Sequence, residues 1–141
     1  MLKHLAPEPR LRLGRALGDA GLATSMIDIS DGLSTDLSHI LEESSVGATI
    51  HASSLPINAC VLSAAAAQPA VDPTTLALNG GEDYELLFTV QPHDQDRLTF
   101  LAKTVGETVT PIGEISTGRE LRLERNGLIE TVQPRGYEHI I

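Results

Sequence analysis

The spacing of hydrophobic residues changes early in the chain, and the change marks a join between a strand and a helix. From Met26 to Ser30, apolar and polar residues alternate, which is typical of a strand with one buried face. After Gly32 the apolar residues stand at positions 33, 37, 40 and 41, and this spacing predicts an amphipathic helix over residues 33–43. We therefore expect a turn at Ser30, Asp31 and Gly32.

Hydrophobic periodicity and turn residues also predict the helices and strands in the rest of the chain. They predict helices over 9–20, 59–67 and 94–104, with Asn58 as the N-cap of the second. They predict strands over 48–51, 84–90 and 109–115, a loop over 68–75 that contains Pro69 and Pro73, and a hairpin over 121–131 that turns at Asn126-Gly127. Helices and strands are mixed without strict alternation, and a hairpin is present. We therefore predict one α+β domain over residues 1–141, with a mixed, mainly antiparallel sheet covered by helices.

Composition and charge narrow the classes of partner. The 141 residues carry 10 Lys and Arg against 19 Asp and Glu, a formal charge of −9, which argues against nucleic acid or an anionic membrane surface as the partner. The chain contains no run of ~18 apolar residues, so we expect no membrane span. A single cysteine, Cys60, cannot form an internal disulfide, and this indicates a cytoplasmic protein.

The turn between the first strand and its helix combines two carboxylates and a hydroxyl, those of Asp28, Asp31 and Ser30. Exposed N–H groups and the helix dipole attract anions there, and carboxylate and hydroxyl oxygens suit Mg²⁺. Asp28 stands between Ile27 and Ile29, where a buried carboxylate needs a cation or hydrogen-bonding partners. The alternative is that Ser30 or Asp31 is simply the N-cap of the following helix.

A second acidic motif, Gly80-Gly81-Glu82-Asp83, precedes a run of apolar and β-branched residues. By itself this motif indicates no more than a turn. If the strand begins here, Glu82 and Tyr84 share one face while Asp83 and Glu85 share the other. The sequence leaves open whether Glu82 or Glu85 faces a ligand, and we favour Glu82 because the glycines bring it closest to the turn.

The two motifs together carry a family resemblance. Residues 26–33 followed by residues 80–90 resemble the C-terminal half of thiamine-monophosphate kinase, and the likeness extends from Pro9-Arg10 to Gly136-Tyr137-Glu138-His139. That family belongs with aminoimidazole ribonucleotide synthetase, selenophosphate synthetase and a hydrogenase-maturation protein, which share a two-domain ATP-binding design. The resemblance implies the C-terminal-domain fold of aminoimidazole ribonucleotide synthetase and transfer of the ATP γ-phosphoryl group to thiamine phosphate.

The resemblance also implies a role for each motif residue. Asp28 and Asp31 would be Mg²⁺ ligands, Ser30 an ATP contact, and Glu82 and Tyr137 contacts of thiamine phosphate. The family's N-terminal half, which carries Asp-rich metal motifs, has no counterpart in these 141 residues. We therefore expect the C-terminal domain of a cytoplasmic kinase that is homodimeric when complete, and a fragment that is inactive alone. The alternatives are a sister ATP-dependent synthetase and a stand-alone domain that binds a nucleotide or a protein without catalysis.

Overall fold

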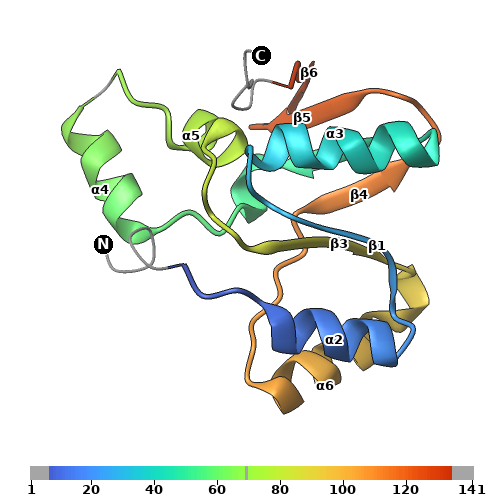
Figure 1. Cartoon of the computed structure of the whole chain (residues 1–141). Coiled ribbons are helices and arrows are strands. Elements are labelled where there is room, and N and C mark those ends of the chain that lie inside the picture. Colours follow the sequence, from blue (N-terminus) through green and yellow to red (C-terminus); the bar gives the residue numbers. More distant parts are fainter. Residues whose placement is uncertain (1–6, 69, 135–141) are drawn as a thin grey trace, which may run out of the picture.

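Residues 7–68 and 70–134 are described by this computed structural model, and they form helices and strands in mixed order (Figure 1). The helices are α2 (Leu11–Asp19), α3 (Leu33–Ser44), α4 (Ala59–Ala67), α5 (Pro73–Asn79) and α6 (Gln95–Val105). The strands are β1 (Ala23–Asp28), β2 (Gly47–His51), β3 (Leu86–Val90), β4 (Gly113–Ser116), β5 (Leu121–Arg125) and β6 (Leu128–Thr131). The predicted α+β class is confirmed.

The strands form two sheets where the sequence suggested one. β1 and β3 pair antiparallel as a two-stranded ribbon that ends with Asp28 opposite Leu86. The second sheet has the order β4-β2-β5-β6, in which β2 and β5 are parallel and the other pairs are antiparallel. The predicted mixed, mainly antiparallel pairing is therefore confirmed, although it is divided between two sheets.

Two hydrophobic cores lie on either side of the β1–β3 ribbon. The α3 core contains apolar residues of α3, α5 and the four-stranded sheet, and the α2/α6 core contains those of α2 and α6. Figure 1 shows the ribbon crossing the middle of the molecule, with α3 and the larger sheet above it and α2 and α6 below. Successive side chains of a strand point to opposite faces. Leu87 therefore packs in the α3 core while Leu86 and Phe88 pack against the α2/α6 core.

Local sequence signals account for several element boundaries. The Asn58 side chain accepts a hydrogen bond from the Cys60 N–H at 2.9 Å and so caps α4 where the sequence predicts it. Asn126 and Gly127 both have positive φ, 54° and 78°, as the tight turn of the β5–β6 hairpin requires. Within the described residues, no helix is both long and apolar enough to cross a membrane.

The prediction of a loop over residues 68–75 is wrong in its second half, where α5 begins. The Asp72 carboxylate accepts a hydrogen bond from the Thr74 N–H at 3.2 Å, and Pro73 occupies the first helical position. Both are ordinary signals of a helix start, because proline has no N–H to leave unpaired. The missed helix matters for function, since α5 ends directly before Gly80.

Candidate functional site

The fold brings the two acidic motifs into direct contact through their backbones. The Glu82 N–H donates to the Ser30 carbonyl at 2.8 Å and the Tyr84 N–H donates to the Ile29 carbonyl at 2.8 Å. In return, the Ile29 N–H donates to the Glu85 carbonyl at 2.9 Å. Residues 28–32 and 80–85, called the loop pair below, therefore form one structural unit.

Two glycines permit this close approach. A Cβ atom added to Gly81 would lie 2.6 Å from the Ser30 carbonyl oxygen, which is closer than real contacts of this kind. Gly32 has a φ of +119°, and its Cβ would lie 3.1 Å from the backbone of Asn79 at the end of α5. Glycine is required at position 81 because no side chain fits between the two loops, and it is favoured at position 32 because residues with a Cβ rarely adopt this φ.

Residues 80–85 are not the start of the strand. β3 begins at Leu86, and both Glu82 and Tyr84 have positive φ, 65° and 50°, which extended strands do not adopt. The expectation that Glu82 and Tyr84 share one strand face is therefore wrong. Glu82 and Tyr84 instead donate their N–H groups to two successive carbonyls of the facing loop.

A residue that the sequence analysis did not identify, Asp36, organises the turn. Its Oδ2 atom accepts hydrogen bonds from the N–H groups of Ser30, Asp31 and Gly32 at 3.0, 3.1 and 3.2 Å, and the residue is only 2% exposed. The N-cap of α3 is Gly32, so the alternative reading of Ser30 or Asp31 as the cap is wrong. The N–H groups of these three residues already have an acceptor, so they are not the free groups that anion binding at this turn would need. An acidic residue in the first turn of a predicted helix was the available signal.

The candidate metal ligands lie at the rim of the loop pair. Asp28 is exposed at the end of β1, so the argument that its burial requires a partner does not hold, while Ser30 and Asp31 are half-buried. No cluster of three His, Cys, Asp or Glu side chains with metal-binding geometry occurs in residues 7–68 and 70–134. The donor set of two carboxylates and a hydroxyl fits Mg²⁺, which completes its shell with waters and phosphate oxygens.

The two glutamates that the sequence left as alternatives have different surroundings. Arg10, just before α2, donates two hydrogen bonds to the Glu85 carboxylate, both at 2.8 Å, and this pairing raises the pKa of Arg10. The Glu82 side chain is exposed and has no ion pair or side-chain hydrogen bond with the rest of the described chain. Glu85 is thus occupied in structure while Glu82 is available. Tyr137 lies outside the described residues.

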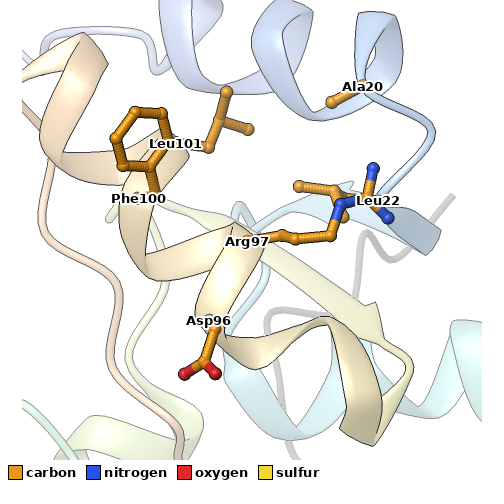
Figure 2. Close-up of a pocket in the computed structure, with 6 residues that line it drawn as sticks. All are labelled: Ala20, Leu22, Asp96, Arg97, Phe100 and Leu101. Carbon is orange, nitrogen blue, oxygen red and sulfur yellow. The ribbon is translucent and has the colours of Figure 1, made fainter.

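Surface hollows lie elsewhere. One of about 420 Å³ is lined by Ala20, Leu22, Asp96, Arg97, Phe100 and Leu101. Figure 2 shows it between α2 and α6, with the Leu101 side chain directed from α6 towards α2. A second hollow of about 360 Å³ borders the β5–β6 turn. Neither of these two hollows includes Asp28, Ser30, Asp31 or Glu82.

Comparison with known proteins identifies the family of this fold. Residues 2–126 match the family described as AIR synthase related protein, C-terminal domain. The chain belongs to this family. It is 42% identical over 114 residues to the thiamine-monophosphate kinase of Haemophilus influenzae and 38% identical over 140 residues to that of Salmonella typhimurium. The suspected relationship to thiamine-monophosphate kinases is therefore confirmed.

Solved structures agree with this assignment. The thiamine-monophosphate kinase of Stenotrophomonas maltophilia matches 86% of the chain with a TM-score of 0.74 and 36% identity. A structure described as AaThiL complexed with AMPPCP and TMP matches 98% of the chain with a TM-score of 0.79 and 28% identity. The Escherichia coli hydrogenase maturation protein HypE, at 20% identity and a TM-score of 0.72, shares the fold alone.

The match covers only part of each relative. The alignments span 81% and 97% of this chain but 33% and 41% of the Haemophilus and Salmonella kinases. The two solved kinase structures are covered to 37% and 40% of their chains. The chain therefore corresponds to one family domain within longer relatives.

Proposed function

We propose that this chain is the C-terminal domain of a kinase that transfers the γ-phosphoryl group of ATP to thiamine phosphate and gives thiamine diphosphate. The observation that carries the proposal is its identity of 38–42% to thiamine-monophosphate kinases over 81–97% of its length. The contact between the two motifs that carry the resemblance supports it. A related structure is described as a complex with AMPPCP and TMP, and we extend those two ligand classes to this chain.

In this proposal the loop pair holds the two substrates by its side chains. Ser30 contacts ATP, and Asp28 and Asp31 are the residues that would hold Mg²⁺. Bound Mg²⁺ supplies neutralisation of the phosphate charges, which is a large part of catalysis in phosphoryl transfer. The N–H groups of Ser30, Asp31 and Gly32 donate hydrogen bonds to Asp36, so in the proposal these residues contact the nucleotide through side chains.

Thiamine phosphate would contact the other loop. Glu82 is exposed there and carries an unpaired carboxylate, whereas Glu85 is held by Arg10. We therefore assign Glu82 to thiamine phosphate, together with Tyr137 by resemblance. In the proposal a second domain supplies the opposite wall of the site.

The proposal extends to the location and oligomeric state of the whole enzyme. The whole enzyme is cytoplasmic and forms a homodimer through contacts made largely outside this domain. The chain alone is inactive. Calorimetry of the purified chain with ATP and Mg²⁺ should show binding that is weak or undetectable. Tight binding that depends on Mg²⁺ would contradict the need for a second domain.

The test of the function is a hybrid enzyme. The matching region of the Haemophilus influenzae kinase is replaced by this chain, and the product of ATP and thiamine phosphate is identified by chromatography. Formation of thiamine diphosphate at a rate within about 10-fold of the parent kinase is expected, which corresponds to a change of at most about 1.4 kcal/mol in the barrier. A folded hybrid that hydrolyses ATP but phosphorylates other acceptors would favour a sister synthetase. A folded hybrid without any ATP-dependent activity would remove the catalytic assignment.

A further inference from the structure

We propose that Asp36 is a positioning residue that fixes both loops of the candidate site through two peptide groups. This inference rests on the proposed function only for its kinetic consequence, because the geometry is independent of it. Asp36 lies in the first turn of α3, is 2% exposed, and contributes no side-chain atom to the exposed rim. Its effect on ligands therefore passes through the residues that it holds.

The first clamped peptide group joins Ile29 to Ser30. Its N–H, that of Ser30, donates to Asp36 Oδ2 at 3.0 Å, and its carbonyl, that of Ile29, accepts from the Tyr84 N–H at 2.8 Å. A peptide group is planar, with its N–H and carbonyl on opposite edges. This plane is therefore fixed at both edges, by Asp36 on one side and by the second loop on the other.

The next peptide group, between Ser30 and Asp31, is held in the same way. The Asp31 N–H donates to Asp36 Oδ2 at 3.1 Å, and the Ser30 carbonyl accepts from the Glu82 N–H at 2.8 Å. The Cα atom of Ser30 lies between these two fixed planes, so both of its backbone dihedral angles are set. The direction of the Ser30 Cα–Cβ bond follows from them, and this limits the places that the hydroxyl can reach to the rotamers that this backbone allows.

One oxygen atom thus controls residues assigned to different substrates. Ser30 and Asp31 are on the ATP side of the proposed site, and Glu82 is on the thiamine phosphate side. Loss of the Asp36 carboxylate leaves three N–H groups without their acceptor, that of Gly32 in a buried place and those of Ser30 and Asp31 in partly buried ones. Donors that are shielded from water in this way are costly, so the turn must move to satisfy them. Both loops should then shift together.

The direct test is amide hydrogen exchange of the full chain followed by NMR. In Asp36→Ala we expect exchange at Ser30, Asp31 and Gly32 to accelerate by about 10-fold or more, as the loss of about one hydrogen bond per amide predicts. The amides of Glu82 and Tyr84, which donate to the clamped peptides, should accelerate as well. Acceleration confined to Ser30, Asp31 and Gly32 would contradict the coupling between the loops.

Asp94→Ala is the matched control for loss of stability. Asp94 is also a buried carboxylate, 8% exposed, but it precedes α6 and pairs with Arg97 at 2.6 Å. The Asp94→Ala variant should have a lower melting temperature without selectively faster amide exchange in the loop pair. Equal acceleration of the five loop amides in both variants would show general destabilisation and overturn the proposal.

The kinetic arm uses the hybrid kinase. Asp36→Asn keeps one side-chain oxygen acceptor and should raise KM for ATP and for thiamine phosphate by several fold, with a larger effect in Asp36→Ala. Asp94→Asn should change neither KM. Unchanged KM values in Asp36→Asn and Asp36→Ala, with only a lower melting temperature, would reduce Asp36 to a structural role. If the unsubstituted hybrid is inactive, the proposed function fails. The amide exchange data then decide by themselves whether Asp36 positions the two loops.

Discussion

The α3 core and the α2/α6 core are built from similar aliphatic residues, but only one of them carries candidate chemistry. Asp28, Ser30, Asp31 and Glu82 all lie where β1, α3 and α5 meet, next to the α3 core. No candidate residue lies on α2 or α6. The β1–β3 ribbon contributes residues to both cores. The α2/α6 core therefore packs on the face of the ribbon opposite the α3 core, and the α3 core is the one that packs next to the loops.

This difference predicts that damage to the α2/α6 core lowers stability and leaves ligand recognition intact. Leu17, on α2, is completely buried. Leu17→Ala should lower the free energy of unfolding by about 2–5 kcal/mol, because it removes buried methyl groups and leaves a cavity. The control Leu11→Ala, on the exposed face of the same helix, should change it by less than about 0.5 kcal/mol. Denaturant unfolding measures both. A raised KM for either substrate in a folded Leu17→Ala hybrid would break the distinction between the cores.

Glycine-to-alanine substitutions should have opposite effects in the two regions. In Gly81→Ala the new Cβ meets the Ser30 carbonyl oxygen, and we expect a loss of about 1–3 kcal/mol in stability, as for overpacking. Gly18 lies inside α2 with no atom within 4 Å of an added Cβ. Gly18→Ala should stabilise by about 0.5–1 kcal/mol through helix propensity. Thermal unfolding of both variants checks the prediction, and a stable Gly81→Ala protein would contradict the close packing of the loop pair.

Substitutions of the two glutamates of the second loop should affect different quantities, substrate binding for Glu82 and fold stability for Glu85. Glu82→Gln should raise KM for thiamine phosphate in the hybrid by about 10-fold, as expected for loss of one charged contact worth about 1.4 kcal/mol. Glu85→Gln should leave that KM unchanged and cost about 1 kcal/mol or less in stability, because its ion pair with Arg10 is partly exposed. The reverse pattern of KM values would assign the substrate contact to Glu85.

The smallest predicted effect concerns pH and the helix that leads into Gly80. A hydrogen bond from Arg125 lowers the pKa of Asp72 from 3.8 to about 2, against the opposing effect of burial. A depressed carboxyl pKa stabilises the fold above its unfolded value and loses this contribution as the pH falls through the folded value. Relative to Asp72→Asn, the native chain should be more stable at pH 7 by at most about 1 kcal/mol, because the pair is exposed to solvent screening. The advantage should vanish between about pH 4 and pH 2, and an advantage that persists below pH 2 would contradict this assignment.

Local sequence signals predicted much of the fold but only part of the site. The stripe of α3, the Asn58 cap and the Asn126-Gly127 turn are encoded by neighbouring residues, and all three were predicted. The division into two sheets depends on pairing between distant strands, which periodicity does not specify. α5 differs from the predicted loop because Pro73 stands at the first helical position behind the Asp72 cap, where proline favours a helix start.

The two motifs of the site were linked by the family resemblance, and the hydrogen bonds between their backbones support that link. Glu82 and Tyr84 adopt positive φ although neither is glycine, so a strand pattern could not describe them. Asp36 was overlooked because an aspartate in a helix is normally solvent-exposed, and its acceptance of three N–H groups is visible only in three dimensions.

Substitution of Asp31 tests most directly whether the loop pair is one wall of a kinase site. In the hybrid kinase, kcat/KM for thiamine phosphate phosphorylation is measured for Asp31→Asn and for the control Asp19→Asn, an exposed residue of α2 paired with Arg15. We expect Asp31→Asn to lose at least about 100-fold and Asp19→Asn to stay within about 2-fold of the unsubstituted hybrid. Equal kcat/KM in Asp31→Asn, Asp19→Asn and the unsubstituted hybrid would contradict the account.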